Sequence, residues 1–137
     1  MKRLHVHLGV RSIAPSVAFY TRLFAAEPVV RKPDYAKWLL ENPRVNFAIS
    51  TRADPGLSHL GIETDNREEL AQVHARLSKA GGPQLDEGET TCCYARSRKA
   101  WVADPQDIAW ETFFTSGEAT DYGTGPGQDW RGGAALR

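Results

Sequence analysis

The chain has 137 residues, the size of one ordinary domain, and its 17 basic and 17 acidic residues cancel. This balance argues against a nucleic-acid partner or an anionic membrane surface, and no apolar run approaches the roughly 18 residues of a membrane span. Residues 1–7 alternate polar and apolar side chains instead of forming the apolar core of a signal peptide. We therefore expect a cytoplasmic protein whose two thiols are reduced.

The first half of the chain predicts a strand, a helix and three further strands. Apolar residues alternate with polar ones over 4–10, which predicts a strand. Apolar residues then recur at helical spacing from Ile13 to Phe24, with Ser12 as the N-cap, and Glu27-Pro28 ends this helix. Short strands follow at 28–32, 35–41 and 44–51.

The same order of elements then begins again. A strand is expected over 57–63, and Asn66 with Glu69 forms a capping box for a second helix that stops at 80–83. Strands are predicted at about 84–88, 91–97, 98–103 and 108–115. An internal repeat of this kind predicts an α+β fold built from two βαβββ modules, at about 1–53 and 57–115.

Residues 116–137 differ from the rest of the chain. They contain six glycines, few apolar residues and no periodic pattern. Such a composition does not build a core of its own, so we expect a flexible, glycine-rich tail without chemistry.

The two halves can be aligned in two ways. One alignment matches His7 to His59, and the other matches His5 to His59. Only the second also places a helix residue of the first half, Phe19, on its counterpart Val73 without a gap. We therefore take His5 and His59 as equivalent positions of the repeat, with His7 on the same strand face in reserve.

Glu111 completes a candidate metal site. It lies in the final predicted strand among aromatic and β-branched residues, where an unpaired carboxylate is costly unless it is paired or bound to a metal. Two imidazoles and one carboxylate form the ligand set of many non-haem Fe(II) sites, and the same set also holds Mn(II), Zn(II) or Ni(II). The predicted catalytic metal ligands are thus His5, His59 and Glu111.

The two cysteines of the chain, Cys92 and Cys93, are adjacent. Disulfides prefer Cα atoms roughly 5.5 Å apart, whereas neighbouring residues lie about 3.8 Å apart, so a staple between distant segments is not expected. Two neighbouring thiols can chelate one soft ion. A regular strand would point them to opposite faces, so shared binding requires the backbone to leave strand geometry here. Positive charge favours the thiolate, and basic residues follow closely at 96, 98 and 99.

Several motifs together resemble one superfamily. The patterns His5-x-x-Leu8-x-Val10, Ser16-x-x-Phe19-Tyr20, His59 and Trp110-Glu111, within residues 3–115, resemble the vicinal oxygen chelate superfamily, which includes glyoxalase I, extradiol dioxygenases and antibiotic-resistance proteins. Within it, the chain is most similar to carbon–arsenic lyases and their cadmium-induced relatives. The motifs that carry this closer resemblance are Asp34-Tyr35-Ala36-Lys37-Trp38 and Thr91-Cys92-Cys93-Tyr94-Ala95.

The resemblance implies paired βαβββ modules around a metal cup and an enzyme of arsenic resistance. It implies Fe(II)- and O₂-dependent cleavage of the carbon–arsenic bond in trivalent organoarsenicals, such as methylarsenite or aromatic arsenicals, with arsenite as the product. His5, His59 and Glu111 would hold the metal, and Cys92 and Cys93 would bind arsenic. A homodimer is compatible with this family.

Two alternatives remain open from the sequence. A thiol-based protein that sequesters Cd(II) or As(III) would need the cysteines but neither Glu111 nor O₂. Another metal-dependent activity of the superfamily, such as thiol transfer to an antibiotic or glyoxalase-type isomerisation, would need the metal ligands but not the cysteines. The organic group preferred on arsenic, the native metal, and closure of the modules within one chain or across a dimer also stay open.

Overall fold

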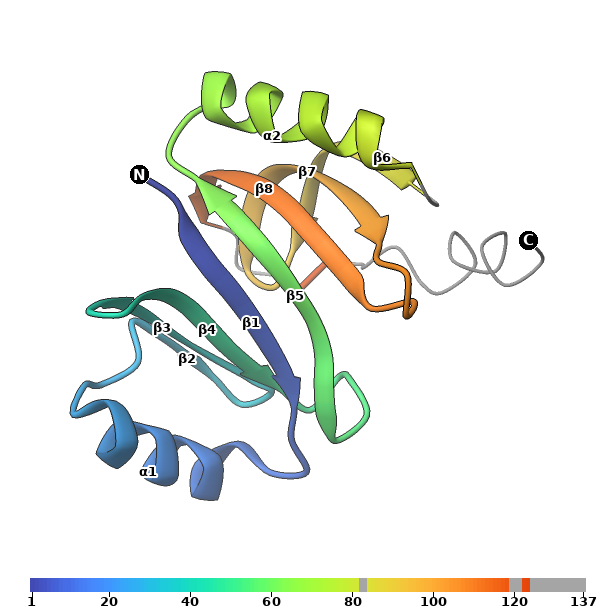
Figure 1. Cartoon of the computed structure of the whole chain (residues 1–137). Coiled ribbons are helices and arrows are strands. Elements are labelled where there is room, and N and C mark those ends of the chain that lie inside the picture. Colours follow the sequence, from blue (N-terminus) through green and yellow to red (C-terminus); the bar gives the residue numbers. More distant parts are fainter. Residues whose placement is uncertain (82–83, 119–121, 124–137) are drawn as a thin grey trace. The chain divides into compact units, whose positions relative to one another are not determined.

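The computed structural model describes residues 1–81, 84–118 and 122–123 (Figure 1). Two compact units divide the chain: the N-terminal unit, Arg3–Leu60, and the C-terminal unit, which runs from Gly61 onward and includes Met1–Lys2. Within these described residues, neither helix is long and apolar enough to cross a membrane. The elements in chain order are β1 (Arg3–Gly9), α1 (Ile13–Phe24), β2 (Val30–Lys32), β3 (Tyr35–Glu41), β4 (Arg44–Ser50), β5 (Gly56–Thr64), α2 (Arg67–Ala80), β6 (Gln84–Cys92), β7 (Ala95–Ala103) and β8 (Ala109–Glu118).

The strand–helix–three-strand order occurs twice, as the repeat predicted, and the fold is α+β. The boundary between the units falls inside β5, between Leu60 and Gly61, rather than in the connector between residues 53 and 57. β5 therefore contributes its first residues to one unit and its last residues to the other.

The N-terminal unit has a sheet with the strand order β2-β3-β4-β1, in which β1 runs parallel to β4. Helix α1 covers one face of it (Figure 1) and buries Ile13 and Val17 against Trp38, Phe47 and Ile49. Burying each large apolar side chain contributes about 1.5–3 kcal/mol. Because side chains alternate along a strand, the histidines of β1 lie on the face away from this core.

The C-terminal unit pairs β8, β7 and β6 as an antiparallel sheet, with the end of β5 beside β8. The hydroxyl of Thr64 donates to the carbonyl of Phe113 at 3.2 Å. Helix α2 covers one face of this sheet (Figure 1). Its predicted capping box is confirmed, because Asn66 Oδ1 accepts from the Glu69 N–H at 2.8 Å. The Glu69 carboxylate in turn accepts from the Asp65 N–H at 3.1 Å, one residue earlier than in the standard motif.

Three boundary predictions differ from the structure. The predicted strand 91–97 does not exist, because β6 ends at Cys92 and β7 begins at Ala95. The strand predicted over 84–88 ends too early, because β6 continues past Gly88 to Cys92, with a bulge between Asp86 and Gly88. Strand β8 continues to Glu118, so it includes the first three residues of the predicted tail, whose remainder lies largely outside the described residues.

The helix register that supported the repeat alignment is wrong. Phe19 is 60% exposed, whereas its supposed counterpart Val73 is buried. When the buried positions of the two helices are aligned instead, Val17 corresponds to Leu70 and the partly buried Tyr20 corresponds to Val73. The helix offset is therefore 53 residues, while His5 and His59 differ by 54.

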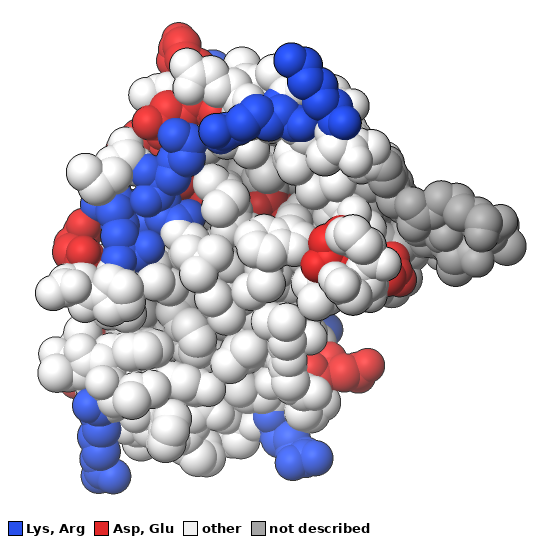
Figure 2. Space-filling model, viewed as in Figure 1, with Lys and Arg blue, Asp and Glu red and all other residues white. Residues whose placement is uncertain are grey.

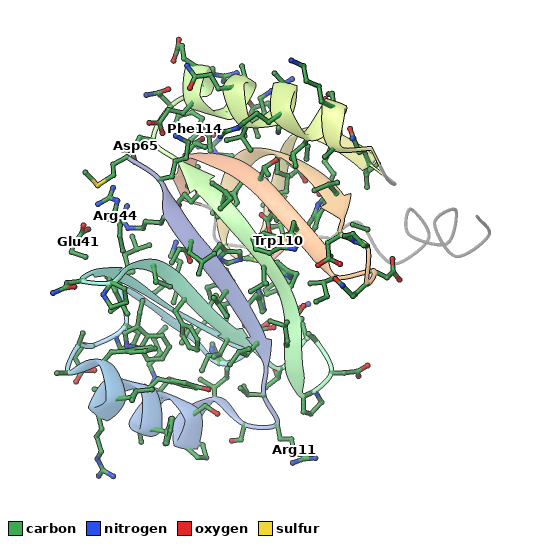
Figure 3. The ribbon with its side chains drawn as sticks, viewed as in Figure 1. Arg11, Glu41, Arg44, Asp65, Trp110 and Phe114 are labelled. Atoms are coloured by element: carbon green, nitrogen blue, oxygen red, sulfur yellow. The ribbon has the colours of Figure 1, made fainter. Side chains whose placement is uncertain are left out.

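Charged side chains of both signs share the face shown in Figure 2. In the N-terminal unit, Glu41 pairs with Arg44 at 2.5 Å (Figure 3) and also with Arg3. Glu41 is largely exposed, and exposed pairs of this kind are worth at most about 1 kcal/mol. We interpret these pairs as solvated surface rather than as a binding site.

Candidate functional site

Three histidines gather in the N-terminal unit. His5 and His7 come from β1 and His59 from β5, and one ring nitrogen of each lies within 4.8 Å of the others. The Nε2 atoms of His5 and His59 are 3.2 Å apart. Two nitrogens bound to one ion at about 2.1 Å, at angles of 90–109°, would be about 3.0–3.4 Å apart. The observed distance therefore fits two ligands of one metal ion.

Each of these histidines has a further contact that orients its ring. His5 Nδ1 lies 3.2 Å from both the carbonyl oxygen and Oδ1 of Asn46. His59 Nδ1 lies 3.1 Å from the hydroxyl of Ser58, and His7 Nε2 lies 2.9 Å from the hydroxyl of Ser50. Metal-bound histidines usually use their second nitrogen in this way, which fixes the tautomer. The structure thus brings together His5, His59 and the reserve candidate His7.

The cysteine pair lies at a tight turn in the C-terminal unit. Cys92 ends β6, and Cys93 and Tyr94 have φ values of 57° and 61°, as in the two-residue turns of β-hairpins. The backbone therefore leaves strand geometry here, as shared thiol binding requires. The two Sγ atoms are 2.9 Å apart and so point to one place. Gly123 forms a β-bridge with Cys92 at the base of the turn.

The two thiols differ electrostatically. The hydrogen bond from Cys93 lowers the pKa of Cys92, and the charge of Lys99 lowers it further, against the opposing effect of burial. The same hydrogen bond, together with burial, raises the pKa of Cys93 well above its usual value. Cys92 is therefore the thiol of the pair that loses its proton more readily.

Glu111 is buried in the C-terminal unit, and its partner there is Lys99. The carboxylate Oε1 lies 2.8 Å from the Lys99 ammonium, and the two residues are only 5% and 3% exposed. Burial alone would lower the pKa of Lys99, but the negative charges of Glu111 and the cysteines raise it. The expectation that this carboxylate is not left alone is confirmed. The partner was missed because a lysine after a turn usually lies in solvent.

Cys92, Lys99 and Glu111 share one face of their sheet. Residues paired across strands point the same way, and the register pairs Cys92 with Ala95, Lys99 with Phe113 and Glu111 with Trp101. Positions 95, 97, 99 and 101 of β7 alternate along the strand and therefore point to one face of the sheet. Lys99 is one of them, and Cys92 and Glu111 are paired with two others, so all three reactive side chains lie on the face opposite α2.

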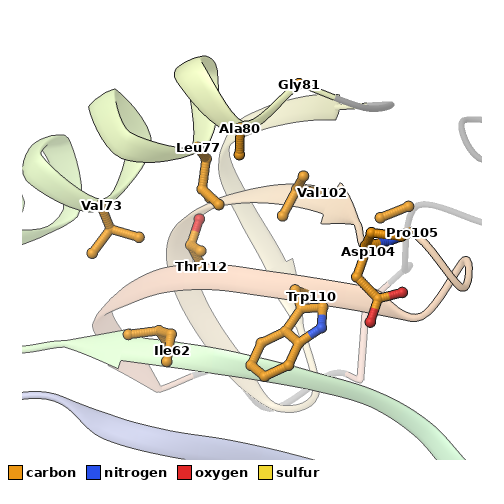
Figure 4. Close-up of a pocket in the computed structure, with 11 residues that line it drawn as sticks. Ile62, Val73, Leu77, Ala80, Gly81, Val102, Asp104, Pro105, Trp110 and Thr112 are labelled. Atoms are coloured by element: carbon orange, nitrogen blue, oxygen red, sulfur yellow. The ribbon is translucent and has the colours of Figure 1, made fainter.

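The opposite face contains an apolar cavity of about 590 Å³ beneath α2 (Figure 4). Val73 and Leu77 line it from the helix, and Trp110 and Thr112 line it from β8. These last two residues flank Glu111 in sequence, so the cavity and the Glu111 carboxylate lie on different faces. The cavity is therefore separate from the thiol and carboxylate groups.

The predicted metal ligands are divided between the two units. His5 and His59 belong to the N-terminal unit and Glu111 to the C-terminal unit. The structure places His5 and His59 together in the first of these units and pairs Glu111 with Lys99 in the second. Their union at one metal ion remains a prediction.

The chain matches known proteins over most of its length. Residues 2–112 match the model of the Glyoxalase/Bleomycin resistance protein/Dioxygenase superfamily. A trivalent organoarsenical cleaving enzyme of Bacillus sp. (strain MD1) is 42% identical over 130 residues, covering 92% of this chain and 81% of that protein. Cadmium-induced protein CadI of Mycobacterium tuberculosis (strain ATCC 25618 / H37Rv) is 34% identical, with 92% and 84% covered. The Mn(II)-bound glyoxalase from Novosphingobium aromaticivorans has a TM-score of 0.61 at 15% identity, over 92% of this chain and 44% of that one, and so shares the fold.

Proposed function

Because the chain belongs to the glyoxalase/bleomycin resistance protein/dioxygenase superfamily, we propose that it is a carbon–arsenic lyase of arsenic resistance. Its substrate would be a trivalent organoarsenical such as methylarsenite or an aromatic arsenical, and its product arsenite. The observation that carries this proposal is the turn at Cys92 and Cys93, which aims two thiols at one point. The relative that cleaves trivalent organoarsenicals supports the same substrate class.

The cysteine pair would capture the substrate by ligand exchange. The Cys92 thiolate attacks arsenic and displaces one hydroxyl group, and Cys93 then displaces the second. Two As–O bonds break, two As–S bonds form, and two waters leave with the two thiol protons, while arsenic stays trivalent. Arsenic is soft and prefers thiolates, so the pair would hold it in place for cleavage of the bond to carbon.

A metal ion would be held by His5, His59 and Glu111. The donor types fit Fe(II), and the 3.2 Å separation of the two Nε2 atoms fits a shared ion. When bound there, Fe(II) would supply O₂ binding and electron transfer for cleavage of the carbon–arsenic bond. Asn46 and Ser58 would keep the two imidazoles in the orientation that binding needs.

A second candidate is thiol-based sequestration of soft ions. The cadmium-induced relative and the paired thiols favour it. This function would require Cys92 and Cys93 but would be indifferent to Glu111 and to oxygen.

Arsenic speciation on matched variants separates the two functions. Wild-type protein with Fe(II) in air should convert methylarsenite to arsenite, and Cys93→Ser and Glu111→Gln should each lose at least about tenfold in rate. Glu89→Gln makes the same change at an exposed position and should leave the rate unchanged. Tight binding without arsenite, unaffected by Glu111→Gln, would instead establish sequestration.

A further inference from the structure

We propose that Lys99 is a positioning residue that serves two reactive groups at once: it holds the Glu111 carboxylate and supplies the positive charge that keeps the Cys92–Cys93 pair ready to react. This inference deepens the proposed function and rests on it for the identity of the substrate. The effect on thiol reactivity can be measured without arsenic or metal.

The position of Lys99 is unusual for a lysine. Only 3% of it is exposed, although lysine is almost never fully buried unless it is paired. Its ammonium donates to Glu111 Oε1 at 2.8 Å and lies 5.9 Å from the ring centre of Phe113. Two anchors therefore fix the charge on the face that also carries Cys92. The bond to Oε1 fixes the orientation of the carboxylate and directs Oε2 away from Lys99.

The charges that act on Cys92 come from three strands. β6 supplies Glu87, whose carboxylate accepts the indole N–H of Trp101 at 2.5 Å, and β8 supplies Glu111. Both carboxylates oppose a thiolate, as does burial. The cation in this set is Lys99 of β7, which lowers the pKa of Cys92. A charge buried with its partners is screened little by salt, so its effect reaches across the face.

One cation shared by a carboxylate and a thiolate couples the two. When Glu111 loses its charge, the whole charge of Lys99 acts on the cysteines, which should react faster. When Lys99 loses its charge, Glu111 and Glu87 act unopposed, and the cysteines should react more slowly. A lysine with only a structural role would change stability without this opposite pair of effects.

The test is the pH profile of alkylation by iodoacetamide, followed by intact mass spectrometry on the full-length, metal-free protein. At pH 7, Lys99→Met should alkylate about fivefold more slowly than wild type, and Glu111→Gln should alkylate faster. Lys99→Arg keeps the charge and should restore the profile. Lys79 lies on the exposed side of α2, so Lys79→Met is the matched control and should leave the pH profile of alkylation unchanged.

If Lys99→Met fails to fold, it is replaced by the double variant Lys99→Met with Glu111→Gln, which removes both charges of this buried pair. Since the proposal makes Lys99 the dominant charge acting on the cysteines, the double variant should still alkylate more slowly than wild type. Profiles of Lys99→Met or of the double variant that match the Lys79→Met control would overturn the inference. Failure of the lyase proposal alone would leave the alkylation results unchanged, so the two failures are distinguishable.

Discussion

Removing the Lys99 ammonium should destabilise the protein far more than removing an exposed partner of an ion pair. Lys99→Met leaves the carboxylate of Glu111, only 5% exposed, without its 2.8 Å partner. Stranding one buried charge in this way costs about 3–5 kcal/mol. For a domain of this size, each kcal/mol lowers the melting temperature by about 3–5 °C, so we expect a fall of about 10–20 °C.

The matched control is Arg67→Met in the pair Arg67–Glu89, which has a similar 2.9 Å distance but side chains that are 60% and 49% exposed. Its loss should cost at most about 1 kcal/mol. Urea unfolding at pH 7, followed by tryptophan fluorescence, gives both free energies of unfolding. Adding Glu111→Gln to Lys99→Met should recover at least half of the loss, because the stranded charge is removed. Equal losses for the two single variants would refute the description of this pair as a buried ion pair.

Three further predictions concern other contacts. Asn46→Leu removes the side-chain contact of His5 Nδ1 and should weaken Mn(II) or Fe(II) binding, measured by calorimetry, by about tenfold; unchanged affinity would contradict the role of Asn46. Burial lowers the pKa of His74 from 6.5, so the unfolded chain binds this proton more tightly; stability should fall as the pH drops below 6.5, and His74→Gln should flatten that part of the urea-midpoint profile. Gly123 has φ 77°, and an added Cβ would overlap the carbonyl of Thr91, so Gly123→Ala should break the bridge to Cys92 and accelerate thiol alkylation; an unaltered rate would show that the bridge does not cover the thiols.

Most of the fold was accessible from sequence because its signals are local. Alternation along β1, the helical spacing from Ile13 to Phe24 and the Asn66 cap each depend on neighbouring residues. The turn at Cys93 and Tyr94 was not predicted as such, because neither residue is typical of a positive φ. Only the chemical argument, that two adjacent thiols must leave strand geometry to share a ligand, pointed to it.

The parts that sequence missed depend on contacts between distant residues. Lys99 follows two arginines and has the pattern of a solvated surface, and only the register of β7 with β8 places it beside Glu111. The exposure of Phe19 shows the same limit, since the face of a helix that is buried is decided by the sheet beneath it. His5 and His59 lie together in the structure, although the helix alignment behind their choice was wrong.

Oxygen-dependent cleavage of a carbon–arsenic bond can be tested by varying iron and oxygen independently. Metal-free protein would be given methylarsenite with or without Fe(II), under argon or in air, and the arsenic species separated by chromatography with elemental mass detection. Arsenite is expected only where Fe(II) and air are both present. Arsenite without iron, or without oxygen, would contradict the proposed lyase function, and so would methylarsenite that stays bound and unconverted in all four samples.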